Sequence, residues 1–184
     1  MNLRPPQIPL PRRLSRVEKF SNPWLTLYED SVEFSPTHTG GYAILEKPDF
    51  SLVIPLAGHR VCLVRQYRYP VGRWGYEFPQ GSTQDAGPRP SAEQEALREL
   101  REETGLIARS LEPLGSIHES AGISASRCHL FAAEIEAEAA AQPEPTEIIS
   151  GILWVDRHEF WDLVARGEIT DSPTIAAMGI YSRR

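Results

Sequence analysis

The chain has 184 residues and a formal net charge of −6; 41% of its residues are hydrophobic and 24% are charged. This length and composition predict one globular domain of ordinary size and exclude a disordered chain. The negative charge argues against a protein that binds nucleic acid through bulk attraction to phosphate, and it suits a protein that binds cations.

The first half of the chain is rich in predicted strands. The N-terminal segment, rich in Pro and Arg, is expected to be irregular up to about Ser15. β-branched and aromatic runs separated by Gly, Pro and Asn then predict strands. These runs cover residues 24–34, 41–47, 50–56 and 60–68, and a short strand at 76–82 stops at a Pro and a Gly.

One helix interrupts the strands. Ser91 is a good N-cap, Gln94 completes a capping box, and the helix is expected to run to about Thr104 and to end at Gly105. Further strands are predicted at 111–120, 127–136 and 148–155, followed by helices at 157–167 and 172–184, the last capped by Ser172. Strands and helices do not alternate, so the order predicts an α+β fold, an α/β sandwich of mixed β-sheets.

The sequence also bears on the compartment. Cys62 and Cys128 lie in apolar runs without metal-type spacing, which predicts buried free thiols in a reducing compartment. The N-terminus has no continuous apolar run of the signal-peptide kind, and no stretch of the chain could span a bilayer. We therefore expect a cytoplasmic protein with no membrane partner.

The helix carries its acids where they destabilise it. Glu99, Glu102 and Glu103 share one face near the C-terminal end, and Glu95 lies one turn earlier in the same sector. Like charges one turn apart repel, and carboxylates meet the negative end of the helix dipole there. A solvated face would instead carry basic residues in its last turn. A hard divalent cation, Mg²⁺ or Mn²⁺, would offset the repulsion.

Residues 98–106, "RELREETGL", match the second half of the Nudix box: Gly, five residues, Glu, seven residues, then Arg-Glu-aliphatic-x-Glu-Glu-x-Gly-aliphatic. "VRQYRYPVGRWGYEFPQG" (64–81) and "GEITDSPTIAAM" (167–178) resemble the ADP-ribose pyrophosphatase branch of that superfamily. The resemblance covers about residues 20–180. It implies a Nudix fold, an α/β/α sandwich with one catalytic helix after the "PQG" loop and an N-terminal antiparallel strand extension.

The chain departs from the family pattern in three places. The loop between Gly81 and Arg98 is three residues longer, and Pro90 stands where the pattern has its first Glu. Either Glu77 or Glu95 is a candidate substitute for that carboxylate. The branch more often has Pro-Ala-Gly where this chain has "PQG", but any residue at position 80 can supply a backbone carbonyl.

The resemblance implies Mg²⁺-dependent hydrolysis of the pyrophosphate bond of ADP-ribose or a related nucleoside diphosphate sugar, with Mn²⁺ able to substitute. The products would be a nucleoside monophosphate and a sugar phosphate. Alternatives are another nucleoside diphosphate derivative, an oxidised nucleoside triphosphate, a dinucleotide polyphosphate, or a sensor that binds nucleotide sugars without turnover. Pro90 is the residue that favours a sensor, and the three intact carboxylates weigh against it.

The roles of the box residues follow from the same resemblance. Glu99, Glu102, Glu103 and the carbonyl of Gln80 are the expected metal ligands, and Glu102 is also placed among the catalytic residues. Arg98 would pair with a box carboxylate and orient it, although a surface pair with Glu102 is equally compatible with the sequence.

The general base is expected outside the box. In this branch a Glu on the loop before a late strand acts on the attacking water. Glu147 is the best match here, and Glu144 is the second choice.

Three further residues are candidates for contact with the substrate. Arg68 offers a guanidinium fork for phosphate, and Glu77 a water-mediated metal contact. Tyr28 is a possible neighbour of the base or ribose, although a core or interface role is the better interpretation. We expect residues 1–45 to form an arm and strands that dimerise, residues 46–184 to form the Nudix hydrolase domain, and the protein to be a homodimer.

Overall fold

The computed structural model describes residues 8–82 and 90–184. The chain divides into two compact units. The first comprises Met1–Pro48 and Ser120–Ser126, and the second comprises Asp49–Glu119 and Arg127–Arg184. The predicted arm falls in the first unit, and its residues 1–7 lie outside the described residues.

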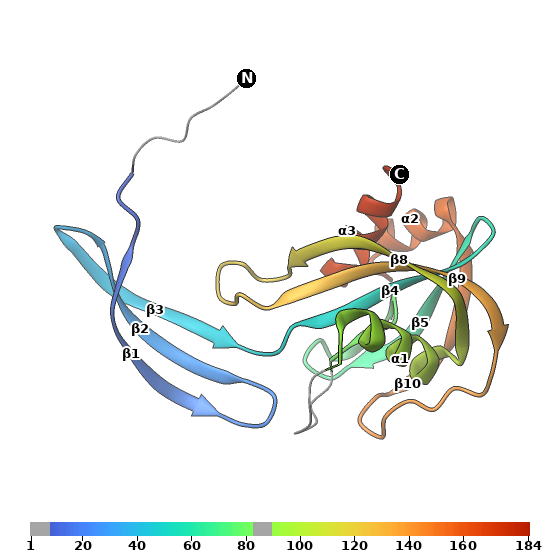
Figure 1. Ribbon diagram of the computed structural model, residues 1–184, viewed down its shortest axis with the longest axis horizontal. Helices are drawn as coiled ribbons and strands as arrows, with labels where there is room; N and C mark the ends of the chain where they lie inside the picture. Colours follow the sequence, from blue (N-terminus) through green and yellow to red (C-terminus); the bar gives the residue numbers. More distant parts are fainter. Residues whose placement is uncertain (1–7, 83–89) are drawn as a thin grey trace. The chain divides into compact units, whose positions relative to one another are not determined.

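The first unit is a three-stranded antiparallel sheet in the order β1-β2-β3, drawn in blue to cyan in Figure 1. The strands are β1 (Arg12–Ser21), β2 (Thr26–Ser35) and β3 (His38–Glu46). Segment 120–126 joins the unit through hydrogen bonds to β3. The Leu45 N–H donates to the Ile123 carbonyl at 2.8 Å, and the Tyr42 hydroxyl donates to the Gly122 carbonyl at 2.8 Å.

The expectation of irregular chain up to Ser15 was wrong, because β1 begins at Arg12. The strand lacks an apolar alternation, so pairing with β2 defines it. Arg12 and Glu33 form an ion pair across the two strands at 2.7 Å, and Lys19 and Glu29 form another at 2.6 Å. Cross-strand pairs of opposite charge stabilise a sheet in a way that a local propensity pattern does not reveal.

The second unit is built on a seven-stranded mixed sheet. Its main path runs β10-β5-β4-β9-β8, with β6 paired to β5 and β7 paired to β4. The strands are β4 (Phe50–Ala57), β5 (Arg60–Arg68), β6 (Arg73–Glu77), β7 (Gln80–Gly81), β8 (Leu106–His118), β9 (Arg127–Glu138) and β10 (Ile149–Asp156). The β4–β9 pair is parallel and the other pairs are antiparallel. The predicted mixed sheet is therefore confirmed.

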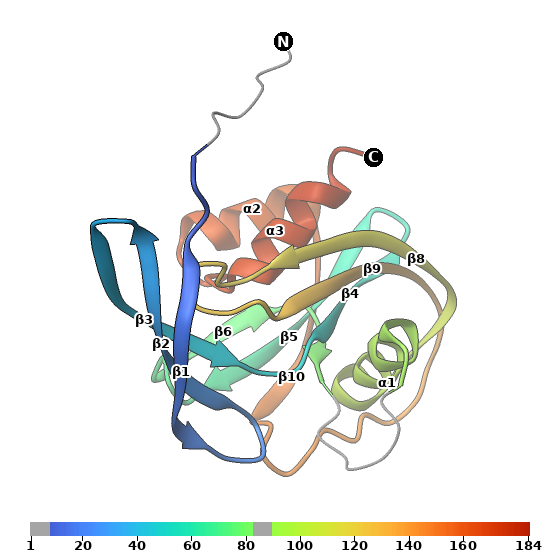
Figure 2. The same ribbon diagram turned by 60° about the vertical axis from the view of Figure 1, so that its left-hand side comes forward.

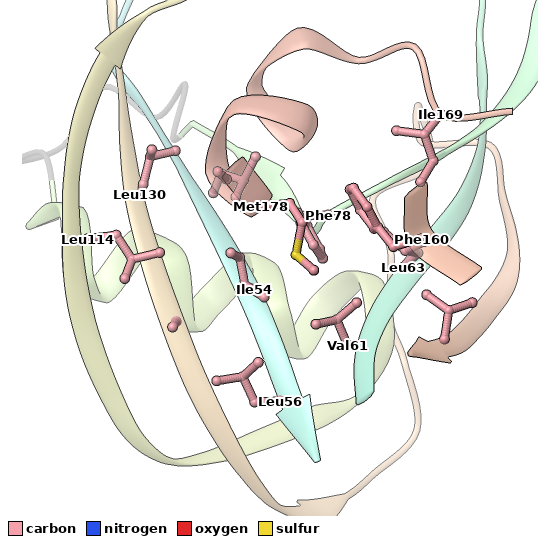
Figure 3. Packing of buried hydrophobic residues seen from close by; sticks show 14 of the residues in the cluster. Ile54, Leu56, Val61, Leu63, Phe78, Leu114, Leu130, Phe160, Ile169 and Met178 are labelled. Atoms are coloured by element: carbon pink, nitrogen blue, oxygen red, sulfur yellow. The ribbon is translucent and has the colours of Figure 1, made fainter. Parts of the chain in front are cut away.

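Helices cover both faces of this sheet, as Figures 1 and 2 show for α1 (Ala92–Thr104) on one side and α2 (Arg157–Ala165) with α3 (Ser172–Tyr181) on the other. Two buried clusters lie between these layers. One joins the sheet to the C-terminal helices, and Figure 3 shows Phe78, Phe160 and Met178 gathered there beside Ile54. The other joins the sheet to α1 through Ala96 and Leu100. The α/β/α sandwich is confirmed.

The ends of α1 follow the predicted chemistry. The Ser91 hydroxyl accepts from the Gln94 N–H, and the Gln94 side chain accepts from the Ser91 N–H, so the capping box is complete. Gly105 ends the helix with φ 75°, a left-handed conformation that glycine adopts without a Cβ penalty.

Two details of the helices differ from the sequence prediction. The helical periodicity groups Leu97 with Ala96 and Leu100 on the apolar side of α1, but Leu97 is 41% exposed. The cap of α3 is Asp171 rather than Ser172, because the Asp171 carboxylate accepts from the Thr174 N–H at 2.9 Å. A carboxylate one residue earlier is the stronger acceptor at the positive end of the helix.

The remaining expectations concern the thiols and the membrane. Cys62 and Cys128 are both buried thiols, as predicted. Among the described residues, no helix combines the length and the apolar character needed to cross a bilayer.

Candidate metal and active site

The buried acids of α1 face the "PQG" turn (residues 79–81) and the β9–β10 connection. Glu99 and Glu103 lie one turn apart on the helix and are only 3% and 2% exposed. Glu147 comes from the connection that precedes β10 and is half-buried. One carboxylate oxygen from each of these three residues lies within 4.8 Å of the other two. Three anions this close, taken out of water, repel strongly unless protons or cations neutralise them.

Burial raises the proton affinity of the cluster. The pKa of Glu99 rises to about 8 through burial, with Arg98 opposing the shift and Glu147 adding to it. The pKa of Glu103 is raised well above its ordinary value, first by burial and then by the charges of Glu99 and Glu147. Burial likewise raises the pKa of Glu147. Carboxyl groups with perturbed pKa values that share one location are candidates for a functional site.

The donor set fits a hard divalent cation. Oε2 of Glu103 is buried and has no hydrogen-bond partner within residues 8–82 and 90–184, whereas buried polar atoms are nearly always paired. Carboxylate oxygens are the ligands that Mg²⁺ and Mn²⁺ prefer. Glu99 and Glu103 are therefore the residues best placed to hold such an ion, and Glu147 lies directly beside them.

Strand β7 lies directly against this cluster. A Cβ placed on Gly81 would lie 2.2 Å from Oε1 of Glu99, so only glycine leaves room for that carboxylate. A hydrogen bond from the Gln80 backbone to Glu103 lowers the pKa of that residue and partly offsets the effect of burial. The "PQG" turn and the helix thus form the two walls of the site.

The structure places the third acid of the box, Glu102, differently. Glu102 is less buried, with a side chain 32% exposed, and its carboxylate accepts a hydrogen bond from Nη1 of Arg98. It is outside the three-carboxylate cluster found among the described residues. Arg98 also donates to Glu95 and Glu99, so the arginine contacts three carboxylates of its own helix.

The two candidates for the general base differ in burial. Glu147 belongs to the cluster, and its Oε2 accepts the Glu144 N–H at 2.9 Å. The Glu144 side chain is 60% exposed and approaches Arg98 at 3.9 Å. Glu147 is therefore near the buried acids. Glu144 lies in the adjoining turn, where its backbone forms hydrogen bonds with the side chain and the N–H of Glu147.

Two of the predicted substrate contacts, Arg68 and Glu77, bind each other. Nε of Arg68 donates to both carboxylate oxygens of Glu77 at 3.1 Å, and Nη2 donates to Oε2 at 2.6 Å. Glu77 is nearly buried, and the Arg68 side chain is 41% exposed. Both residues line a pocket of about 320 Å³ together with Trp74 and Asp171. The charge of Arg68 lowers the pKa of Glu103 and of Glu147, so the pocket adjoins the acids.

Tyr28 lies in β2, in the other compact unit, where the Arg16 guanidinium sits 4.7 Å from the centre of its ring. Its assignment to the substrate site stays a prediction.

Sequence reasoning missed the side chain of Gln80. Its Nε2 donates to Oε2 of Glu77 and to Oδ2 of Asp171, each at 3.0 Å. The departure from the alanine usual in the branch was the available signal, because a buried amide needs partners. Asp171 was missed too, although an acid before "SP" at the start of a helix is an ordinary N-cap signal.

A profile of the NUDIX domain matches residues 46–178, and the chain therefore belongs to the NUDIX family. The chain is 27% identical over 172 residues to an ADP-ribose pyrophosphatase of Bacillus subtilis (strain 168), covering 91% of this chain and 90% of the relative. It is 29% identical over 163 residues to a methanol dehydrogenase activator of Bacillus methanolicus, covering 86% and 85%.

A solved structure described as the crystal structure of an ADP compounds hydrolase has the same fold. It covers 96% of this chain and 94% of its own chain with a TM-score of 0.79 at 20% identity. The matches confirm the ADP-ribose pyrophosphatase-like branch predicted from the sequence and, with it, an enzyme of the Nudix pyrophosphohydrolase class.

Proposed function

We propose that the chain hydrolyses the pyrophosphate bond of ADP-ribose or a related nucleoside diphosphate sugar and requires Mg²⁺ or Mn²⁺. The observation that carries the proposal is the buried cluster of Glu99, Glu103 and Glu147 with its unpartnered oxygen. The similarity to an ADP-ribose pyrophosphatase supports the choice of substrate.

The metal ligands would be Glu99 and Glu103 with the Gln80 carbonyl, and Glu102, which Arg98 holds, is the remaining ligand predicted from the sequence. When bound, the divalent ion supplies charge neutralisation at the phosphates and lowers the pKa of water. Arg98 holds Glu99 and Glu102 by direct hydrogen bonds, which is an orienting role.

In the proposed reaction, water oxygen attacks one phosphorus and the bridging oxygen leaves with the other phosphate. Glu147 accepts the proton of the attacking water, and its raised pKa suits a base that works near neutral pH. Arg68 is exposed on one side and held by Glu77 on the other, so its free N–H groups can reach a phosphate in the adjoining pocket.

We also propose a homodimer formed through the first unit. Strand β1 is an edge strand, and Leu14, Val17 and Phe20 on it are 44%, 52% and 53% exposed. An edge strand that bears exposed apolar side chains is suited to pairing with another chain. Tyr28 of this unit would then contribute to the substrate site.

The decisive experiment is a substrate panel with Mg²⁺ and with Mn²⁺. Hydrolysis is followed as phosphate released by a phosphatase from the two monophosphate products. ADP-ribose or another nucleoside diphosphate sugar is expected to be the best substrate, and Glu103→Gln is expected to be inactive. A chain that binds these nucleotides without forming products would be a sensor and would refute the proposal.

A further inference from the structure

Arg98 lies among the carboxylates of α1. Its Nη2 donates to both Glu95 and Glu99, and its Nη1 donates to Glu102. The side chains of Glu95 and Glu99 are 7% and 4% exposed, whereas that of Arg98 is 29% exposed. One guanidinium nitrogen therefore joins a member of the acidic cluster to an acid one turn earlier on the helix.

The burial of Glu95 is not explained by the stability of the helix. An acid in the first turn interacts favourably with the helix dipole, but Glu93 already does so from an exposed position. Burying a carboxylate is unfavourable unless a cation compensates it. Arg98 is that cation, and the ion pair between Glu95 and Arg98 fixes both side chains next to the acidic cluster.

Position 90 cannot take this role. The Nudix pattern places a carboxylate eight residues before Arg98, and this chain has Pro90 there. Glu95 is on the helix itself, three residues before Arg98, and contacts it directly. We propose that Glu95 replaces the absent box carboxylate as a positioning residue: it fixes the Arg98 guanidinium, which in turn orients Glu99 toward the ion.

The alternative placement of Arg98 is visible in the structure. Its Nη1 is already 3.9 Å from Oε1 of Glu144, an exposed side chain on the β9–β10 connection. Without Glu95, Glu99 and Glu102 would remain as the hydrogen-bond partners of the guanidinium among the described residues, and it could turn toward Glu144. Glu99 would then lose the contact that keeps it oriented, with no change in the ligand atoms themselves.

The test compares Glu95→Gln with Glu93→Gln, a matched loss of one first-turn acid from an exposed position. Binding of Mn²⁺ alone is measured by calorimetry, and kcat and KM are measured with ADP-ribose. Glu95→Gln should weaken Mn²⁺ binding about 10-fold and lower kcat by a similar factor at constant KM. Glu93→Gln should match the wild type. Thermal melting without ions should show that both variants fold.

A double-mutant cycle with Arg98→Gln tests whether Glu95 acts through the arginine. Glu95→Gln should have no further effect on Mn²⁺ binding in that background. The inference is overturned if Glu95→Gln matches Glu93→Gln, or if its full effect persists without Arg98.

This inference rests on the proposed function, but the two fail separately. A wild-type chain that hydrolyses no nucleotide refutes the function. An active wild type whose Glu95→Gln variant binds Mn²⁺ normally refutes only the role of Glu95.

Discussion

Gly81→Ala should disable the site without unfolding the protein. The added methyl group would lie 2.2 Å from Oε1 and 2.5 Å from Cδ of Glu99, where ordinary contact begins at about 3.4 Å. The backbone of Gly81 is not in the left-handed region, so alanine is tolerated there without strain. The Glu99 carboxylate must therefore move by more than an ångström. The added methyl group would push this carboxylate out of the cluster, although the carboxylate is buried and accepts a hydrogen bond from Arg98.

A misplacement of about 1 Å at a reacting centre can reduce the rate roughly 100-fold, which corresponds to about 2.7 kcal/mol of activation free energy. We expect that loss in kcat/KM for ADP-ribose with saturating Mg²⁺. The free energy of unfolding should change by less than about 1 kcal/mol, because only the end of a flexible side chain has to shift.

Two other glycines provide controls. Gly179→Ala puts a methyl group into open space on α3 and should leave activity unchanged while stabilising the helix slightly. In Gly105→Ala, the added methyl group would lie 2.1 Å from the Ala139 carbonyl oxygen, and the backbone there is left-handed. This variant should therefore have a lower melting temperature. Wild-type turnover by Gly81→Ala would refute the placement of Glu99 at the reacting centre.

Three further predictions follow from the site and the first unit. Glu147→Gln should lower kcat by about 100-fold or more with little change in KM, whereas Glu144→Gln should stay near the wild type; steady-state kinetics would reveal equal effects if Glu147 is not the base. Because the pKa of Glu99 is raised from 4.5 to about 8, the native state without ions retains a proton that the unfolded chain has released. The free energy of unfolding of the ion-free protein should therefore fall as the pH rises from 4.5 to 8, and saturating Mg²⁺ should reverse that trend. Urea titrations from pH 5 to 9 measure this free energy, and the same value at every pH in the ion-free protein would contradict the prediction. Phe20→Glu should shift a dimer to monomer in sedimentation velocity, and a wild type that sediments as a monomer at tens of micromolar would exclude the homodimer.

Local chemistry made much of the second unit predictable. The capping box of Ser91 and Gln94 and the left-handed Gly105 define α1 from its own residues. Continuous apolar runs identified β4 and β5, whose side chains are buried on both faces of the sheet. In each case the signal lies within a few residues of the feature that it predicts.

The features that were missed depend on distant partners. Strand β1 is defined by its pairing with β2, and the exposure of Leu97 depends on how α1 packs against the sheet. The amide of Gln80 meets Asp171, which is 91 residues away in the chain. The acids of the box were recognisable from their spacing, but the difference in burial between Glu102 and Glu103 came only with the tertiary structure.

The segment that leads into the site is bound to residues near the C-terminal end of the chain. The Tyr76 N–H donates to the Glu168 carbonyl, the Phe78 N–H donates to Thr174 Oγ1, and the Gln80 amide donates to Asp171. During translation, the strand before the "PQG" turn is therefore made well before residues 168–174, which form these hydrogen bonds with it. A nascent chain would carry every proposed ligand and still lack an ordered centre until residues 168–174 have left the ribosome, so the site cannot form before this later segment is available.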